Sequence, residues 1–373
     1  MRRYTSLLLT AFLLFILVVA GSAYFAGAGH DDRTRPLREI VVYTTLPAEH
    51  AAILTNAYEQ SHNVRANFVP LASDELLKRL QKQAEGDENG TAAMVLADKD
   101  TLKKAAVAGY LTPYLSEAGD QVPESFRQQD GYWIGVWYDP IVFCVNKDYL
   151  LTLPLVPDTW KELAAQPKVR IGITDFLAAD ASANLFMSML AQFGDVATYD
   201  IWRQIHPKVV QYARYLSNPV RQAGMGEVDV AIAVESEVIR YMQGGYPLKI
   251  VYPADGTAAL VAGTGIAYKA KAADMAAAKE FADWLLSDEA QQALQKQDFY
   301  FVPTNPGTMA YKSFAGKNML LFDQPVNFTA QQRHDFLDRW VKEVRFKSVV
   351  WLYCDMQRVL SAVQAVSSFV IYA

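Results

Sequence analysis

Polar side chains stand at the ends of several strands that the sequence predicts, or begin the helix that follows. Small ligands of open α/β sheets bind outside the carboxyl ends of the strands, where free N–H groups of helix N-termini attract anions. Hydroxyl groups there suit the oxygens of a phosphate, phosphonate or sugar, whereas carboxylates suit an amine or sugar hydroxyls. The candidate ligand-binding residues of this kind are Thr44, Thr45, Ser73, Asp98, Ser182, Glu235, Ser236, Asp255 and Thr257.

An aromatic segment at 131–140 supplies three further candidates. Trp137 and Tyr138 either form the floor of a binding cleft or fill the core beneath a crossover, and the sequence leaves both interpretations open. Asp139 adds a carboxylate to the candidate site, and the following Pro140 holds it in an extended conformation. An extended segment here is consistent with a chain that passes from one half of the protein to the other.

Catalytic motifs are missing from the sequence. The five histidines have no paired ligand spacing such as H-E-x-x-H, and no G-x-S-x-G, Walker A or complete G-x-G-x-x-G occurs. Glu49 and His50 are neighbours that point to different helix faces, so joint metal binding is not expected. The two-glycine segments 224–226 and 263–265 are interpreted as turns. The missing motifs argue against an enzyme, and we expect no catalytic residue, no metal and no cofactor.

The elements that must position the candidate residues alternate between strand and helix. The predicted strands are 40–43, 64–69, 92–97, 169–174, 228–234 and 248–252. The helices that follow them include 51–60, 75–85, 99–108, 179–193 and 235–243. This alternation, present once in the first part and again in the middle, predicts an α/β protein of two lobes, each a mostly parallel sheet flanked by helices.

Composition limits the class of protein. Of 373 residues, 51% are hydrophobic and 20% are charged, which excludes a disordered or fibrous chain, and the length favours two domains. The formal net charge of −5 argues against binding of nucleic acid. Cys144 and Cys354 can form at most one long-range disulfide, and two free thiols are an equal alternative.

Both ends of the chain differ from the middle. Arg2 and Arg3 precede an uncharged apolar run at 7–28 that ends in small residues, the pattern of an export signal. Cleavage after Ala23 or Ala28 and retention as a membrane anchor are both compatible with its length. We therefore expect residues 1–36 to be a signal or anchor with a linker and the rest to lie outside the cytoplasm. Residues 347–373 are interpreted as a C-terminal tail of unknown role. It is packed on the last lobe, or in contact with a partner or membrane, or is a segment not native to the fold.

Several stretches, in this order and spacing, resemble a known family. The chain is similar to the family 1 extracellular solute-binding proteins of ABC importers, in the branch that includes ferric-iron, phosphonate and sugar-phosphate binders. The similarity runs from about residue 39 to residue 345. The stretches that carry it are 41–44, 131–143, 226–229, 251–257, 278–286 and 302–305.

The resemblance implies a type II periplasmic-binding-protein clamp. Lobe one is expected at 37–143 and 257–346 and lobe two at 144–256, with the hinge near Cys144 and Pro253. The solute would bind between the lobes, and the closed form would be recognised by an ABC permease in the cytoplasmic membrane. A monomer in the periplasm, or on the outer face of that membrane, is expected.

The ligand is left open by departures from the family pattern. Iron-binding relatives have adjacent tyrosines where this chain has Glu235, Ser236 and Glu237. The family's usual glutamate near the second hinge crossing is Asp255 here. A phosphonate, a sugar phosphate or a similar solute is the first expectation. A ferric-iron-binding protein and a sensory or adaptor ectodomain remain alternatives, and an acidic cleft would favour a cation.

Overall fold

The computed structural model describes residues 38–346, with the exception of 88, 154–155 and 315–318. The expected signal or anchor at 1–36, the tail at 347–373 and Cys354 lie outside the described residues. Within the part described, no helix combines the length and apolar character needed to cross a membrane.

One group of elements, which we call lobe one, is built around three parallel strands in the order β2-β1-β3. Both faces of this sheet are covered, so β1 is rich in Val and Ile, and Ile40 and Val42 are fully buried. Leu76 and Leu80, one turn apart on α3, form the buried stripe of that helix. The elements are β1 (Arg38–Thr44), α2 (Ala48–Ser61), β2 (Val64–Pro70), α3 (Ser73–Glu85), β3 (Met94–Asp98), α4 (Lys99–Val107), β4 (Leu111–Thr112) and α5 (Glu117–Asp120).

A second group, lobe two, repeats the arrangement around the parallel strands β7, β6 and β8. Its helix α8 extends past the predicted end at residue 193, because a second helical segment follows directly after a kink at Gly194, whose φ is 77°. The elements are α6 (Lys147–Leu150), α7 (Trp160–Ala165), β6 (Ile171–Thr174), α8 (Asp180–Ile205), β7 (Val209–Ala213), α9 (Ser217–Gly224), β8 (Val230–Val234), α10 (Glu235–Gln243) and β9 (Leu248–Val251).

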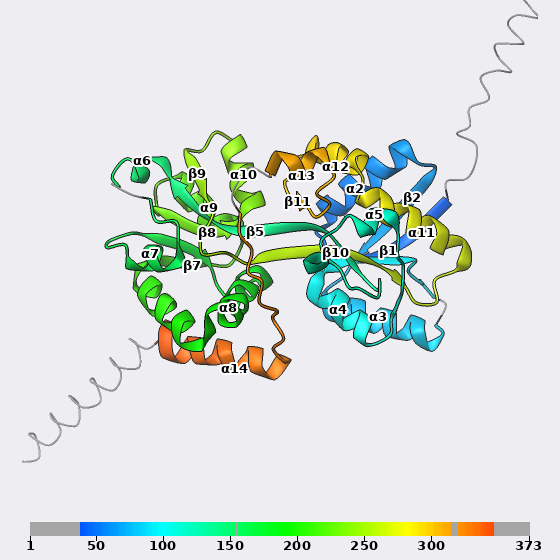
Figure 1. Ribbon diagram of the computed structural model, residues 1–373, viewed down its shortest axis with the longest axis horizontal. Coiled ribbons are helices and arrows are strands. Elements are labelled where there is room, and N and C mark those ends of the chain that lie inside the picture. The colour runs from blue at the N-terminus through cyan, green and yellow to red at the C-terminus, as the bar shows by residue number, and fades with distance from the viewer. Residues whose placement is uncertain (1–37, 88, 154–155, 315–318, 347–373) are drawn as a thin grey trace, which may run out of the picture.

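Two long strands join the lobes (Figure 1). The first half of β5 (Ile134–Asn146) pairs with β10 (Ala259–Ala267) and β11 (Val302–Pro303), and its second half pairs with β8 and β9. β10 in turn pairs antiparallel with β3 of lobe one. One sheet therefore continues through both lobes, with antiparallel strands at the waist and parallel strands on either side. This confirms the predicted α/β fold of two lobes. The expectation of mostly parallel sheets was wrong for the sheet as a whole, because the two waist strands form antiparallel pairs with their neighbours.

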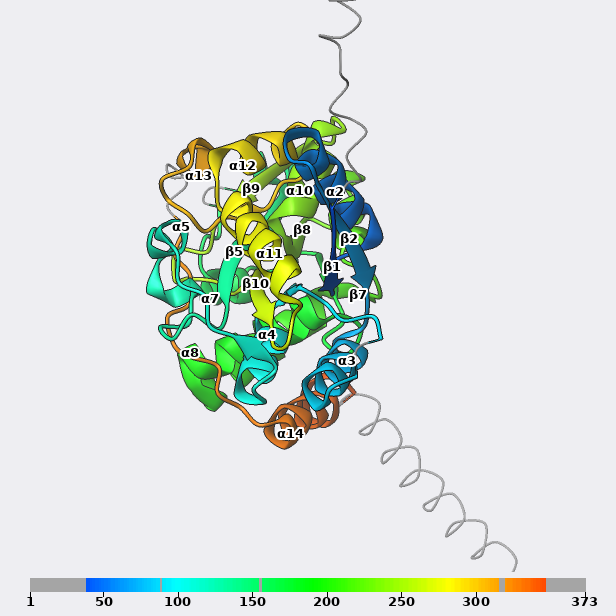
Figure 2. The ribbon, with the colours of Figure 1, turned by 90° about the vertical axis from the view of Figure 1, so that its right-hand side faces the viewer.

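The chain returns to lobe one and then crosses again to lobe two. In Figures 1 and 2, α12 and α13 lie at the top of the molecule and α14 lies at the bottom. The remaining elements are α11 (Ala272–Leu285), α12 (Asp288–Gln295), α13 (Met309–Phe314), α14 (Ala330–Trp340) and a π-helical turn (Val341–Arg345).

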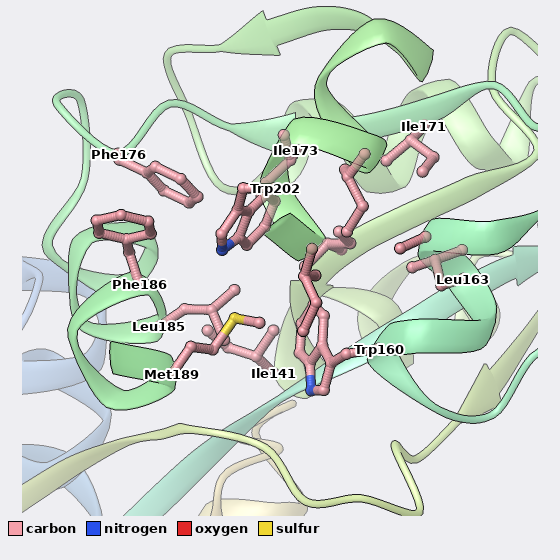
Figure 3. Packing of buried hydrophobic residues seen from close by; sticks show 14 of the residues in the cluster. Ile141, Trp160, Leu163, Ile171, Ile173, Phe176, Leu185, Phe186, Met189 and Trp202 are labelled. Atoms are coloured by element: carbon pink, nitrogen blue, oxygen red, sulfur yellow. The ribbon is translucent and has the colours of Figure 1, made fainter. Parts of the chain in front are cut away.

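An aromatic core fills lobe two (Figure 3). Phe176 stacks on Phe186 with ring centroids 5.1 Å apart and meets Trp202 edge to face at 4.8 Å. Trp340 of α14 joins this core, 4.8 Å from Phe176. Residues 257–346 are predicted to belong to lobe one, whereas α14 packs on lobe two because its buried aromatic side chain completes that core.

Gly263 lies in β10, and not in a turn as its sequence suggested, at a β-bulge opposite β5. A Cβ atom at this position would lie 2.4 Å from the carbonyl oxygen of Ile134. Gly263→Ala is therefore expected to push β10 away from β5 and to lower the free energy of unfolding by about 2–3 kcal/mol in urea denaturation.

Gly307→Ala serves as a control for this prediction. The nearest atom to its new Cβ is the side-chain oxygen of Asn305 at 3.1 Å, which can move. A change within about 0.5 kcal/mol is expected there. Equal stability of the two variants would contradict a close approach of the waist strands.

Candidate functional site

A cavity of about 340 Å³ lies between the two lobes, the size of a small organic molecule. Lobe one contributes Pro47 and the segment 298–301, and lobe two contributes Leu216 and residues of α10. The waist strands β5 and β10 supply the remaining wall. A molecule in this cavity would touch both lobes and both crossing strands.

Half of the residues predicted from the sequence line this cavity, although they are far apart in the chain. They come from the ends of β1 and β3, from the middle of β5 and from the first turn of α10. These residues are Thr45, Asp98, Trp137, Tyr138, Asp139 and Ser236.

Asp98 is held rigidly at the start of α4. Its carboxylate accepts hydrogen bonds from the backbone N–H and the hydroxyl of Thr101 at 2.9 and 2.7 Å, which caps the helix. The hydroxyls of Thr45 and Ser73 donate to the same carboxylate at 3.4 Å each. Ser73 is therefore connected to the cavity wall through Asp98 and does not line the cavity itself.

Asp139 of the waist strand β5 is hydrogen-bonded to lobe two. Its carboxylate oxygens accept from the backbone N–H of Ser236 at 3.0 Å and from the Ser236 hydroxyl at 2.6 Å. Burial raises the pKa of this carboxyl to about 7, against the opposing effect of the two Ser236 hydrogen bonds, and nearby Glu235 and Glu237 raise it further. A group with this pKa exchanges its proton near neutral pH.

The two aromatic candidates occupy both environments that the sequence left open. Trp137 is fully buried, donates from its indole N–H to Gln291 at 2.9 Å and meets Phe299 edge to face at 5.0 Å. Tyr138 stacks on Phe126 at 4.9 Å, and burial raises the pKa of its hydroxyl. Each side chain is thus part of the core and also reaches the cavity wall.

Thr44 and Thr257 do not line the cavity. Both are buried, and their hydroxyls donate to the backbone carbonyls of Leu96 and Ile141, each at 2.7 Å. These hydroxyls stabilise contacts between neighbouring segments of the sheet. Their role is therefore structural, and they are not available to a ligand.

Ser182, Glu235 and Asp255 also lie away from the cavity lining. Ser182 lies against a separate small cavity inside lobe two, beside Thr174. Glu235 is fully buried and accepts a hydrogen bond from the hydroxyl of Tyr252. Asp255 accepts from the backbone N–H of Trp160 at 3.1 and 3.2 Å and so fixes the start of α7.

Charged residues that the sequence analysis did not select line the cavity on α2 and α10. Glu49 and His50 of lobe one face Glu237 and Arg240 of lobe two, and Arg240 forms an ion pair with Glu237. Burial lowers the pKa of His50, whose ring lies edge-on to Phe299 at 5.2 Å. The spacing of Glu237 and Arg240 on one helix face was visible in the sequence, but not which lobe it would face.

The cavity is acidic. Among the described residues that line it, one arginine, Arg240, stands against five carboxyl groups. The part of the chain that the structure describes contains no group of three His, Cys, Asp or Glu side chains placed to hold a metal ion. The five carboxyl groups belong to Glu49, Asp98, Asp139, Glu237 and Asp298.

Solved structures with the same fold are numerous. The periplasmic binding protein AfuA from Actinobacillus pleuropneumoniae, with fructose-6-phosphate bound, is 21% identical at a TM-score of 0.65 and covers 83% of this chain and 99% of its own. The Bordetella ferric binding protein is 24% identical at a TM-score of 0.68, with the same coverage. Iron-bound HitA from Pseudomonas aeruginosa is 17% identical at a TM-score of 0.67, covering 81% of this chain and 98% of its own. These structures support the two-lobed fold.

Sequence comparison identifies the family as well as the fold. An uncharacterized protein of Haemophilus influenzae is 27% identical over an alignment of 350 residues that covers 90% of this chain and 96% of that protein. The sequence model of the bacterial extracellular solute-binding proteins matches residues 54–317, which include both crossing strands and most of the cavity wall. This chain belongs to the bacterial extracellular solute-binding proteins.

Proposed function

We propose that this chain is the exported solute-binding subunit of an ABC importer and that its solute carries a positively charged amino group. The acidic cavity between the lobes is the observation that supports this ligand class. The sequence left open a phosphonate or a sugar phosphate. A phosphonate that also carries an amino group, and is therefore zwitterionic, fits better than a sugar phosphate, because a dianionic phosphate would face five carboxyl groups and one arginine. The chain would act as a carrier and not as an enzyme.

Asp139, Glu237 and Arg240 would divide the recognition of such a zwitterion. The amino group would lie toward Asp139 and Glu237, and its positive charge would favour the ionised form of Asp139. The anionic group would lie toward Arg240, the arginine among the described lining residues. Binding near pH 7 would therefore release a proton from Asp139.

Capture would couple to closure of the lobes. A solute that touches both lobes favours the closed form by the contacts that closure adds. Micromolar binding corresponds to about 8 kcal/mol, which exceeds a difference of a few kcal/mol between open and closed forms. The closed form would then deliver the solute to a permease in the cytoplasmic membrane.

A thermal unfolding series tests the ligand class. We expect 2-aminoethylphosphonate to raise the melting temperature by about 5 °C at 100 times its dissociation constant, and glucose-6-phosphate, methylphosphonate and ferric citrate to leave it unchanged. Isothermal titration in two buffers of different ionisation enthalpy should detect proton release, and Asp139→Asn should abolish that release.

Glu237→Gln tests the contribution of the Glu237 charge to binding, because glutamine keeps a hydrogen-bond acceptor for Arg240 and loses the charge. Its affinity for 2-aminoethylphosphonate should fall about fivefold, because a partly exposed charge pair contributes about 1 kcal/mol. Stabilisation by glucose-6-phosphate or iron but not by any amine would overturn the ligand class. No response to a wide panel of amines, phosphonates, sugar phosphates and metals would overturn solute capture.

A further inference from the structure

Helix α14 packs against lobe two and forms an ion pair with it. Its first turn has a capping box, in which Thr329 and Gln332 exchange side-chain and backbone hydrogen bonds of 3.2 and 2.9 Å. At its other end Trp340 is buried in the core of lobe two, and Arg339 pairs with Asp195 of α8 at 3.1 Å. The helix therefore moves with lobe two, and it lies beyond the residues that the family's sequence model matches.

Arg333 of this helix reaches the other lobe. Its guanidinium lies 3.1 Å from the carboxylate of Asp100, on the first turn of α4 in lobe one. Both terminal nitrogens also donate to the side-chain oxygen of Asn184 on α8 at 3.3 Å, which orients the guanidinium from the lobe-two side. Asp100 is stabilised in turn by the positive end of the α4 dipole.

This ion pair lies outside the cavity lining. Asp98, two residues before Asp100, lines the cavity wall. In Figures 1 and 2, α14 lies at the bottom of the molecule, opposite α12 and α13. In Figure 1, α4 and α14 lie below the waist strands, and α2 and α10 lie above them. The pair between Arg333 and Asp100 is thus separate from the charged residues of α2 and α10, and it forms a contact between the lobes outside the cavity lining.

We propose that Arg333 is a positioning residue that holds the two lobes at the separation that forms the cavity. It does so in the absence of solute, through Asp100 on one lobe and Asn184 on the other. The side chains of Arg333 and Asp100 are 30% and 41% exposed, so salt screens the attraction and its effect is modest. Loss of the pair should change the ratio of closed to open molecules about threefold.

Distance measurements between spin labels test this without any ligand. Val107 at the end of α4 and Val196 on α8 are 91% and 76% exposed, so cysteines there can carry labels on opposite lobes. Cys354→Ser removes a competing thiol, and Cys144 is buried. Arg333→Gln should shift the ligand-free distance distribution about threefold toward the longer population, and Asp100→Asn should do the same.

Two further variants separate the interlobe contact from a general loss of charge. Exchange of the two charges, Arg333→Asp with Asp100→Arg, should restore the original distribution. Arg339→Gln breaks pairs with Asp195 and Glu343 inside lobe two and should leave the distribution unchanged. Raising the salt concentration from about 0.05 to about 0.5 M should move the unchanged protein toward the Arg333→Gln distribution.

The proposal is overturned if Arg333→Gln and Asp100→Asn both keep the original distribution, or if the charge exchange behaves like the single variants. Unfolding curves recorded for each variant show whether it is folded. If the Arg333 variant is not folded, the Asp100 variant tests the same ion pair. Because no solute is present, the outcome does not depend on the ligand class proposed above.

Discussion

Asp139→Asn is expected to make the free energy of unfolding less dependent on pH. In the unchanged protein, the Asp139 carboxyl should lower this free energy by about 4 kcal/mol between pH 4 and pH 7, and the variant should lack this change. The carboxyl of Asp139 is buried, and its pKa is raised from 3.8 to about 7 in the folded protein. Across this range the folded protein keeps a proton that the unfolded chain has lost. The contribution of Asp139 to stability is therefore complete below pH 4 and disappears as the pH rises through 7.

Urea denaturation at intervals of half a pH unit, on both proteins, gives the measurement. The difference in unfolding free energy between the unchanged protein and Asp139→Asn should decline by about 1.4 kcal/mol per pH unit within this window. Asparagine fits the site because its amide oxygen can still accept from the backbone N–H of Ser236, and its amide nitrogen can donate to the Ser236 hydroxyl.

Asp298→Asn is the control for this experiment. Asp298 also lines the cavity, but it is exposed and receives a hydrogen bond from the hydroxyl of Tyr300 at 2.7 Å. Asparagine keeps a hydrogen-bond acceptor for Tyr300 at this exposed position, so the free energy of unfolding should change by less than about 0.5 kcal/mol. A constant difference between the unchanged protein and Asp139→Asn would show that the Asp139 carboxyl is already ionised at pH 4.

Trp160→Ala is expected to lower the free energy of unfolding by about 4–5 kcal/mol. Trp160 is fully buried in the lobe-two core, edge to face with Phe143 at 4.9 Å. Its indole N–H also donates to the carbonyl of Gly256 at 2.9 Å, in the segment that leads into the second waist strand. The substitution therefore leaves a cavity and an unpaired carbonyl, and urea denaturation followed by far-ultraviolet circular dichroism measures the loss.

Trp160→Phe separates the two contributions and remains measurable if the alanine variant does not fold. It keeps most of the ring, so a loss of about 1–2 kcal/mol is expected from the missing hydrogen bond and the smaller side chain. Leu151→Ala, at a position that is 87% exposed, should change stability by less than about 0.5 kcal/mol. A loss for Trp160→Ala no larger than this control would contradict a core role for the residue.

Local patterns predicted most of the regular elements. The expected helix at 235–243 coincides with α10 (Glu235–Gln243), and the expected strand at 64–69 falls short of β2 (Val64–Pro70) by one residue. Such elements are determined by neighbouring residues, since apolar periodicity and capping act within one or two turns. The waist was harder to predict, because β10 contains glycines typical of turns and is a strand only through pairing with β3 and β5.

Sequence patterns alone were enough to predict the two α/β lobes, the family and a set of polar residues near strand ends. Which of these residues face the cavity depended on the packing of the folded chain. Thr44 and Thr45 are neighbours, yet the hydroxyl of Thr44 is bonded to the carbonyl of Leu96, whereas Thr45 lines the cavity. The charges of Arg240 and Glu49 come together across the cavity from helices far apart in the chain. Hydrogen-bond partners and facing charges depend on how the lobes pack together, and that arrangement is fixed by contacts between distant segments, which local sequence patterns do not encode.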